Sequence, residues 1–578
     1  MTTSQPAPRA HKLGVFVRAM ARVSGRGLPP PVCPVAVETG IEVPAGDGVM
    51  LRTDHYLPLM PGPRPALLVR SPYGRGFPWN YLFGALFAGQ GFHVVIQSCR
   101  GTGGSGGELE PGRHERADGH AAVAWLREQD WFSGALGTIG PSYLGYVQWA
   151  LAADPPPELR AIAVQNGFTD LHGLMYRGGA FALEDALTGS AAMLSFEHGL
   201  TSVVRAMTRL LRKHRQVERT LPLIDAYPVA FGRRVGFFEQ WLSHPGGGEE
   251  YWRGLDAGTA GPGVAVSLVS GWQDICLDQT LAAYRRLRDA GRDVRLVIGP
   301  WTHTSAFEKG WPVVFTDVLG WLRAHLGAEP GGEPRPPVRV HVGGCDQWRD
   351  LPGWPPPQAD SQPWYVSADG QLSPVPLSPV PPERPSVSSV HYDPAAPTPS
   401  VGGPLLGSRT SGIRRNDALE ARPDVLTFTS APLAEAVEVI GPVSARLRVR
   451  GSSPHFDVFA RLCDVDPRGH SHNVCDGLVR HRPGSGTGDG DGDGWSTVTV
   501  AMSAAAYQLG AGHRLRLQIS GGAHPRFARN TGTGEPPATA TRLVPVDLEI
   551  QHGTGPGAAL SLPVVTVAGR HPAPAARG

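Results

Sequence analysis

The sequence predicts an α/β protein with an inserted helical cap and a C-terminal β domain, and three patterns along the chain favour this fold class. In residues 37–169 and 253–328, short apolar runs alternate with helix-compatible segments, which is typical of a parallel sheet. Residues 170–252 have a helical pattern, which indicates a cap over the carboxyl edge of that sheet. In residues 329–570, short strands separated by proline- and glycine-rich turns predict an antiparallel β-sandwich.

Composition narrows the classes of partner. The 578 residues carry 53 Lys and Arg against 51 Asp and Glu, without an evident dense basic tract, so we expect no nucleic acid partner. No apolar run is long enough to span a bilayer, so we expect no membrane partner. Six scattered cysteines without a CxxC pair argue against a zinc site and favour a cytoplasmic protein. We expect a small-molecule substrate and no metal or organic cofactor, and a homo-oligomer is left open.

The first part of the chain leads into the predicted sheet. Residues 1–36 are mildly basic and lack the apolar core of a signal peptide, so they are expected to form a tail. Asp47-Gly48 lies between two short apolar segments and predicts a hairpin. Ala66–Val69 and Phe92–Ile96 are continuous apolar runs, as expected of strands buried on both faces. The glycine-rich segment Arg100–Gly107 lacks the Gly-Lys-Ser/Thr ending of a phosphate loop, and we interpret it as a structural loop.

A serine lies at the sharpest expected turn of the chain. The apolar periodicity of Asp118–Gln129 predicts a helix against the sheet. A short apolar run then ends in Gly140-Pro141-Ser142-Tyr143-Leu144-Gly145, which a helix-compatible segment follows. This pattern predicts a nucleophile elbow, in which a tight strand-to-helix turn presents a serine hydroxyl above the sheet. Leu144 stands where the usual second glycine would be, and taken alone the segment also fits a purely structural turn.

Two later turns supply the partners that a serine nucleophile needs. Val264–Val269 predicts a strand that leads to Asp274, and Val294–Ile298 predicts the next strand, which leads to His303. A serine hydroxyl is a weak nucleophile until a base takes its proton, and a histidine base needs a carboxylate to fix its tautomer and balance its charge. Ser142, Asp274 and His303 occur in the chain order of the α/β-hydrolase fold, so we predict that they form a catalytic triad.

Several segments resemble the motifs of the cocaine esterase and X-prolyl dipeptidyl-peptidase family of serine hydrolases, the CocE/NonD family. The resemblance covers roughly residues 37–565 and implies an α/β-hydrolase domain, a helical cap and a C-terminal jelly roll. It implies the same triad, and an oxyanion hole formed by the Tyr73 hydroxyl and the Tyr143 backbone N–H. The motifs that carry it are Ser71-Pro72-Tyr73, Arg100–Gly103, Gly140–Gly145, Gly271–Asp274 and Gly299–His303.

The chain departs from the family pattern near the expected site. Ser98 stands where the family usually has an aspartate, and Gln273 stands where an aromatic residue is common. Family members that hydrolyse α-amino esters carry acidic residues just after the catalytic aspartate. Ile275-Cys276-Leu277 follows Asp274 here, which argues against an α-amino substrate.

These observations predict a serine hydrolase that cleaves an ester or amide through a covalent acyl-enzyme. An acyltransferase that uses the same acyl-enzyme is an alternative, and a non-catalytic carbohydrate-binding module is another. Four aromatic residues are candidates for the substrate pocket, although those of the helical block also fit a role in packing alone. They are Phe168, Tyr176, Phe181 and Trp272.

Overall fold

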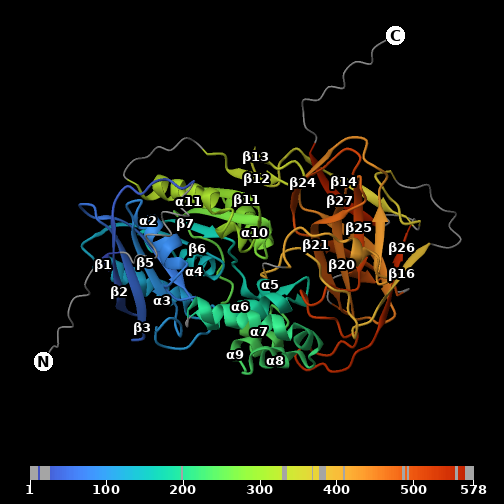
Figure 1. Ribbon diagram of the computed structural model, residues 1–578, viewed down its shortest axis with the longest axis horizontal. Coiled ribbons are helices and arrows are strands. Elements are labelled where there is room, and N and C mark those ends of the chain that lie inside the picture. Colours follow the sequence, from blue (N-terminus) through green and yellow to red (C-terminus); the bar gives the residue numbers. More distant parts are fainter. Residues whose placement is uncertain are drawn as a thin grey trace, which may run out of the picture. The chain divides into compact units, whose positions relative to one another are not determined.

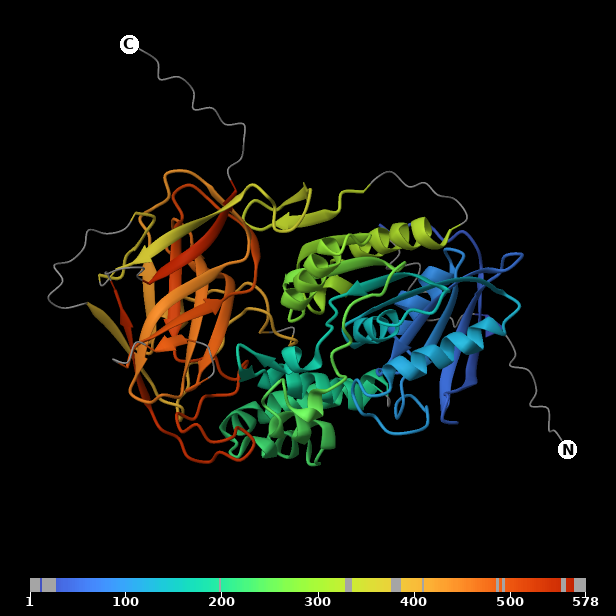
Figure 2. The same ribbon diagram turned by 180° about the vertical axis from the view of Figure 1, so that it is seen from behind.

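The computed structural model describes residues 11–12, 27–196, 199–327, 335–367, 369–375, 386–407, 410–484, 488–490, 494–552 and 558–565. The chain divides into two compact units, shown from opposite sides in Figures 1 and 2. The first comprises residues 1–338, 404–412 and 524–543, and the second comprises residues 339–403, 413–523 and 544–578. The expected N-terminal tail, residues 1–36, lies largely outside the described residues.

The first unit is built on a mostly parallel sheet. Within this unit the strand order is β1-β2-β3-β5-β4-β6-β7-β10-β11. The strands from β5 to β11 in this order pair in parallel, and β1 to β3 extend the sheet with antiparallel pairs. The strands are β1 (His11–Lys12), β2 (Val35–Pro44), β3 (Met50–Pro58), β4 (Arg64–Ser71), β5 (His93–Ser98), β6 (Phe132–Pro141), β7 (Leu159–Gln165), β10 (Ala265–Gln273) and β11 (Val294–Thr302).

Helices flank the sheet and bury its central strands. Ala66–Val69 of β4 and every residue of β5 are buried, as their continuous apolar runs predicted, and every residue of β10 is buried as well. A side chain at Gly137 of β6 would lie 2.7 Å from Leu326, so the glycine lets the last flanking helix approach the sheet closely. These helices are the π-helical turn η1 (Asn80–Ala85), α2 (Leu86–Ala88), α3 (Glu115–Arg127), α4 (Tyr143–Ala152), α10 (Leu277–Asp289) and α11 (Trp311–Leu326).

The segment between β7 and β10 is mainly helical, as predicted, and its larger helices group together apart from α10 and α11 (Figures 1 and 2). The helical prediction missed a small hairpin, β8 (Tyr176–Arg177) and β9 (Ala180–Phe181). Gly178 and Gly179 have φ values of 57° and 81°, and two left-handed residues in succession form a tight hairpin turn. The helices are α5 (Leu171–Met175), α6 (Leu183–Phe196), α7 (Leu200–Arg219), α8 (Ala226–Phe231) and α9 (Gly236–Ser243).

The second unit is an antiparallel β domain with two main sheets. The larger sheet has ten strands, and the smaller has the order β17-β25-β20-β21. The strands of the whole second unit are β12 (Val338–Val342), β13 (Gln347–Leu351), β14 (Ala359–Val366), β15 (Leu372–Ser373), β16 (Val387–Tyr392), β17 (Val425–Thr429), β18 (Val437–Gly441), β19 (Ser444–Gly451), β20 (Phe456–Val465), β21 (Ser471–His481), β22 (Gly488–Gly490), β23 (Ser496–Ala501), β24 (Ala505–Leu509), β25 (Arg514–Ser520), β26 (Val546–Gln551) and β27 (Ala559–Val565), and the unit also has the short helix α12 (Asp417–Glu420).

A separate hydrophobic core stabilises this second unit. Alternate residues of β19 point inward, so Ala445, Leu447 and Val449 join the core while Arg446 and Arg450 are left outside it. The core includes Leu462 from the smaller sheet as well, as in two sheets that pack face to face. The predicted fold class, an α/β sheet with a helical insertion and a C-terminal antiparallel β domain, is therefore confirmed.

Candidate active site

Ser142 occupies the turn between β6 and α4. The strand ends at Pro141 and the helix begins at Tyr143, so one residue makes the whole connection. Ser142 has φ 55° and ψ −121°, a backbone conformation that is uncommon for a residue other than glycine. Its backbone N–H donates to the carbonyl of Gln165 at 3.0 Å, which ties the turn to β7. Such a strained turn at the head of a helix is the geometry of a nucleophile elbow.

Two glycines make room for this turn. Gly140 has φ 147°, and a Cβ there would lie 2.5 Å from the Cβ of Leu144. A Cβ at Gly145 would lie 2.9 Å from Val164 of β7, so α4 can approach the sheet only because this residue lacks a side chain. The second glycine is therefore needed three residues after Ser142, and Leu144 fills the space that Gly140 leaves.

Asp274 and His303 form a buried pair at the ends of two adjacent parallel strands. Asp274 directly follows β10 and His303 directly follows β11, so the pairing of these strands brings both turns to the same edge of the sheet. His303 Nδ1 lies 2.7 Å from Asp274 Oδ1, and the two side chains are 8% and 0% exposed. Because an ionised carboxylate only accepts hydrogen bonds, Nδ1 carries the proton and Nε2 is the basic nitrogen.

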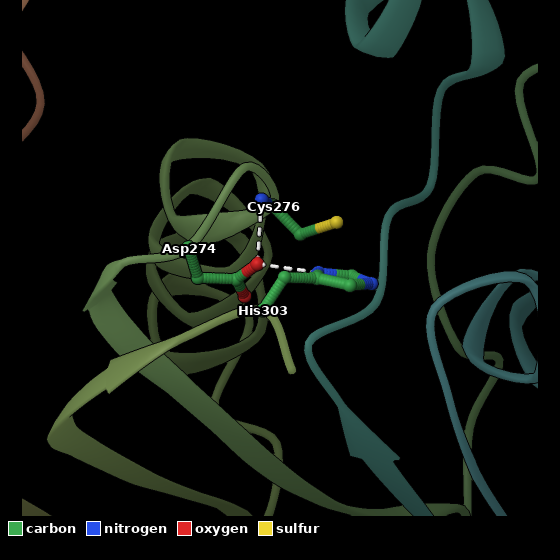
Figure 3. A group of neighbouring side chains, drawn as sticks. All are labelled: Asp274, Cys276 and His303. Atoms are coloured by element: carbon green, nitrogen blue, oxygen red, sulfur yellow. Dashed lines mark hydrogen bonds and ion pairs between the residues drawn. The ribbon is translucent and has the colours of Figure 1, made fainter. Parts of the chain in front are cut away.

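Neighbouring donors hold this pair in place. Ser270 Oγ donates to Asp274 Oδ2 at 2.6 Å, and the Cys276 backbone N–H donates to Asp274 Oδ1 at 3.2 Å (Figure 3). Asn166 Nδ2 donates to the backbone carbonyl of His303 at 2.7 Å, and its own N–H donates to the main chain of β10 at 2.7 Å. Asn166 is fully buried with φ 46°, so it fixes the histidine turn rigidly against β10.

The Cys276 thiol extends alongside the imidazole of His303 (Figure 3). Ligand atoms of Asp274, Cys276 and His303 lie within 4.8 Å of one another, and within the described part of the chain this is the one such group of residue types that bind metals. Burial, and then the charge of Asp274, raise the pKa of the thiol well above its ordinary value. The cysteine is therefore a protonated thiol at neutral pH, and the ring nitrogen and carboxylate oxygen that face each other are already joined by a hydrogen bond. We interpret Cys276 as an apolar neighbour of the pair.

Tyr73 follows β4 and its hydroxyl lies at the elbow. The phenol oxygen interacts with the Ser142 side chain and with the Tyr143 backbone. Burial raises the pKa of Tyr73 to about 12, although these hydrogen bonds oppose the shift. The phenol is thus protonated at neutral pH and can donate a hydrogen bond beside the serine. It also packs against Trp79, whose ring centroid lies 5.7 Å from that of Tyr73.

The side chain of Tyr143 points away from this contact, into a buried polar network. Its hydroxyl donates to Glu115 Oε1 at 2.9 Å and accepts from the backbone N–H of Gly112 at 2.7 Å. Arg70 lies 3.0 Å from the other oxygen of Glu115, so this buried carboxylate is compensated. Tyr143 can therefore contribute only its backbone N–H to the site, at the first turn of α4.

The glycine-rich loop after β5 has a structural role, as interpreted from the sequence. Arg100 at its start donates to both carboxylate oxygens of Asp118 in α3, at 2.7 to 3.0 Å, and also pairs with Asp47. Ser98, the departure noted above, accepts from Arg75 at 2.7 Å. Arg75 lies 3.2 Å from the carboxylate of Asp54, so an aspartate on β3 provides the negative charge that position 98 lacks.

One cavity of about 530 Å³ lies over the elbow. It brings together the predicted Tyr73, Ser142, Tyr143 and His303, with Asp274 behind the histidine. Phe168, predicted to line the pocket, is among its lining residues. The wall is mostly apolar, and many of its residues come from the cap and carry no signal in the sequence. These include Leu174, Met175, Met193, Phe196, Met207 and Trp241.

Three predicted pocket residues do not line this cavity. The Tyr176 hydroxyl donates to the backbone carbonyl of Trp241 at 2.9 Å, and its ring packs against Phe181. Phe181 is fully buried and also packs edge-on against Phe238 of α9. Trp272 is buried near the end of β10. Tyr176 and Phe181 thus lie in the internal packing of the cap, the alternative role that fits residues of the helical block.

Two carboxylates reach the cavity from outside the triad. Asp185 of α6 is buried, forms an ion pair with Arg177 and accepts from the backbone N–H of Leu406 at 2.8 Å. Glu308 is exposed and follows the turn that carries His303. The negative charge of Asp185 is therefore balanced within the protein, and the exposed Glu308 is solvated.

Family models match both parts of the chain. Residues 47–305 match the X-Pro dipeptidyl-peptidase (S15 family) model, and residues 330–558 match the model of the X-Pro dipeptidyl-peptidase C-terminal non-catalytic domain. Cocaine esterase from Rhodococcus sp. (strain MB1 Bresler) is 31% identical over 543 residues, which cover 86% of this chain and 93% of the relative.

Solved structures agree in fold. An α-amino acid ester hydrolase has a TM-score of 0.75 at 19% identity, with 93% of this chain and 98% of that chain covered. A CocE/NonD family hydrolase from Staphylococcus aureus has a TM-score of 0.67 at 16% identity, with 92% and 94% covered. At these identities the likeness concerns the fold alone.

Proposed function

The chain belongs to the S15 (X-Pro dipeptidyl-peptidase, CocE/NonD) family of serine hydrolases, and from this premise we propose that it is an esterase that cleaves uncharged, apolar esters through Ser142, His303 and Asp274. One observation carries the proposal. A single cavity holds a serine at a strained turn, a histidine paired with a buried aspartate, and a wall that is mostly apolar.

In the first step, Ser142 Oγ attacks the acyl carbon of the ester while His303 Nε2 takes the hydroxyl proton. The imidazole becomes a cation, and Asp274 stabilises it through the 2.7 Å hydrogen bond from Nδ1. Ser270 and the Cys276 N–H keep the carboxylate oriented for this task. The tetrahedral intermediate then collapses, and the leaving alkoxide takes the proton from Nε2.

The negative charge on the carbonyl oxygen needs two donors in this step. The Tyr73 hydroxyl and the Tyr143 backbone N–H are suited to this role, because both lie at the elbow and neither carries charge itself. The raised pKa of Tyr73 keeps its proton in place at neutral pH. Water activated by His303 attacks the acyl-enzyme in the second step, the same donors hold the second oxyanion, and the acid is released.

The cavity wall favours an ester without charge over an Xaa-Pro peptide. A peptide substrate brings an N-terminal ammonium, which requires an unbalanced carboxylate once water is excluded. Asp185 is already paired with Arg177, and Ile275-Cys276-Leu277 after Asp274 has no acid. Glu308, the other carboxylate that reaches the cavity, is exposed to water and does not provide a buried negative charge. The apolar wall instead fits a hydrocarbon or aromatic group, whose burial is favourable by about 25 cal/mol per Å².

A substrate panel tests the proposal. A fluorophosphonate probe should label the purified chain and should fail to label Ser142→Ala. We expect kcat/KM for p-nitrophenyl esters to rise with acyl chain length until the cavity is filled, and to exceed that for Xaa-Pro-p-nitroanilides. A higher kcat/KM for Xaa-Pro amides would replace the esterase proposal by a peptidase. Transfer of the acyl group to an added alcohol in preference to water would indicate an acyltransferase.

A further inference from the structure

Helix α7 carries a concentrated positive charge, although the net charge of the whole chain is close to zero. The helix has six basic residues and one acid, a net charge of +5, whereas the entire chain has a net charge of +2. The rest of the chain is therefore slightly negative, and the absence of a dense basic tract expected from the sequence does not hold for this helix. The basic residues are Arg205, Arg209, Arg212, Lys213, Arg215 and Arg219, and the acid is Glu218.

The exposed face of α7 carries two parallel rows. Arg205, Arg212 and Arg219 are exposed and follow one another at intervals of seven residues, so they lie on one face of the helix. Val204 and Leu211 precede the first two of these arginines and are 58% and 54% exposed. A row of cations thus runs beside large apolar side chains. We call these five residues the α7 face.

The cations of this helix have little compensation in the protein. Across the ranges that the structure describes, no carboxylate forms an ion pair within 4.0 Å with Arg205, Arg209 or Arg212. Glu218 is partly buried, and burial raises the pKa of its carboxyl, whereas nearby cations that include Arg215 and Arg219 oppose the shift, so these two arginines are partly compensated. Isolated surface cations are ordinary, but a cluster without counter-ions repels itself and gains from an anionic partner.

The other side of α7 holds the helix in the cap. Val217 is buried, and the helix packs against α6 and α8. Met207 lines the catalytic cavity and lies three residues after Val204 and four before Leu211, so the apolar row borders the side of the helix that meets the cavity. The three exposed arginines of the α7 face lie on the side away from Val217.

The partner of such a face must be negatively charged and must also accept aliphatic side chains. An anionic phospholipid bilayer meets both demands, because its headgroups attract arginines and its acyl boundary accepts exposed Val and Leu. We propose that the α7 face binds the surface of an anionic phospholipid bilayer. The cap, which contributes Met207 to the cavity, then lies next to the phase in which apolar esters dissolve.

Co-sedimentation of the full chain with lipid vesicles tests this proposal independently of catalysis. Vesicles of phosphatidylcholine alone are compared with vesicles that contain about 30% phosphatidylglycerol. We expect ~10-fold tighter binding to the anionic vesicles, and a loss of that difference in about 0.5 M salt, which screens the charges. Equal binding to both vesicle types, or no binding to either, overturns the proposal.

Matched variants locate the binding face. Arg205→Gln, Arg212→Gln and Arg219→Gln combined should weaken anionic-vesicle binding ~10-fold, since glutamine keeps helix propensity and removes three charges. The control combines Arg160→Gln, Arg285→Gln and Arg292→Gln, which removes the same charge outside the cap and should leave binding intact. Unchanged hydrolysis of a short soluble ester shows that both variants are folded. An equal loss of binding in the two sets overturns the proposal.

The apolar row separates a bilayer from a soluble polyanion. Val204→Ser with Leu211→Ser should weaken vesicle binding severalfold while heparin binding is unchanged, because only the bilayer accepts the aliphatic groups. If the serine variant binds vesicles as the parent does and heparin competes fully, the face recognises a polyanion and the lipid proposal is rejected.

Discussion

The sheet edge holds a buried carboxylate and the cap holds a partly buried one, and the two regions differ in how they stabilise the negative charge. Asp274 at the sheet edge accepts from His303 Nδ1, Ser270 Oγ and a backbone N–H, so its negative charge is fully solvated by donors. Glu184 in the cap accepts from Thr410 Oγ1 at 3.3 Å and lies beside Asp185, and burial with this neighbouring charge raises its pKa to about 7. The donors at the strand ends stabilise the negative charge of Asp274 that the reaction needs, whereas the surroundings of Glu184 in the cap favour an uncharged carboxylic acid.

The difference follows from how the two regions place their side chains. At the sheet edge, parallel strands and one-residue turns fix the backbone, and the backbone fixes Ser142 and His303. In the cap, helices and a small hairpin pack through side chains, so the residues that form the cavity wall depend on the detailed fit of side chains such as Met193. Substitutions at the edge should therefore change the rate, and substitutions in the cap should change selectivity or stability.

The largest expected effect is at the elbow itself. Ser142→Ala removes the nucleophile and should lower kcat by ~10⁶-fold, as when a triad serine is removed in other hydrolases. The unfolding midpoint should change little, because the hydroxyl is not part of the packing. Steady-state kinetics with a p-nitrophenyl ester measures the loss. A variant that keeps more than a few per cent of the activity would place the chemistry elsewhere than at the sheet edge.

Tyr73→Phe tests whether the tyrosine that follows β4 takes part in catalysis. The change keeps the ring stacked on Trp79 and removes only the hydroxyl that reaches Ser142 and the Tyr143 backbone. The loss of one oxyanion donor should lower kcat by ~10²- to 10³-fold with a smaller change in KM. Near-normal kcat in this variant would make Tyr73 a wall residue, comparable to Phe168.

The pH dependence of stability sharpens the contrast between the two carboxylates. The pKa of Glu184 is raised from 4.5 to about 7 in the folded chain, so the folded state binds an extra proton between these values. This contribution to stability is complete below about pH 4.5 and is lost as pH rises through about 7. Glu184→Gln, which keeps the acceptor for Thr410, should therefore raise the free energy of unfolding relative to the parent by ~1–3 kcal/mol at pH 8 and much less at pH 5.

Chemical denaturation at the two pH values measures this difference. Glu308→Gln serves as the matched control, because Glu308 is exposed and its charge costs nothing to solvate. It should shift the unfolding midpoint equally little at pH 5 and pH 8. A Glu184→Gln variant with no gain at pH 8 would mean that the cap holds a charged carboxylate, as the sheet edge does.

The smallest effect separates a residue that lines the cavity just before the cap from a residue that packs within the cap. Phe168→Ala enlarges the cavity and should shift relative kcat/KM toward longer acyl chains by ~10-fold, since a few methylene groups contribute 1–3 kcal/mol. Tyr176→Phe loses the hydrogen bond to Trp241 and should cost about 1 kcal/mol of stability without changing that preference. The ester panel and thermal unfolding of both variants distinguish the two roles. If Tyr176→Phe also changed the preference for acyl chain length, then Tyr176 would influence the substrate pocket although it does not line the cavity.

The same contrast decides what could be predicted from the sequence. Strand-then-turn patterns placed Ser142, Asp274 and His303 at one edge, because parallel strands bring consecutive carboxyl ends together. No comparable rule tells which face of a cap helix meets the cavity, so Phe196 and Trp241 were not singled out and Tyr176 was. The hairpin at Gly178-Gly179 carried a recognisable signal, two adjacent glycines, within a segment interpreted as helical.

Charge was the least predictable property. The near balance of Lys and Arg against Asp and Glu describes the chain as a whole, yet the folded cap displays Arg205, Arg212 and Arg219 together. Only the helix period, once the helix bounds are known, shows that residues seven apart share a face. The described residues include no helix that is both long and apolar enough to cross a bilayer.

The displaced glycine of the elbow has a consequence for finding other members of this family. Gly145 is required because α4 meets Val164 at that residue, and Leu144 at the preceding position fills the space above Gly140. A genome scan that demands Gly-x-Ser-x-Gly would overlook Ser142 and would match Gly103–Gly107 in the structural loop, although the steric requirement of the elbow is satisfied one residue later. A more sensitive search would fix the serine, allow the second glycine to follow by two or three residues, and require an apolar strand before it.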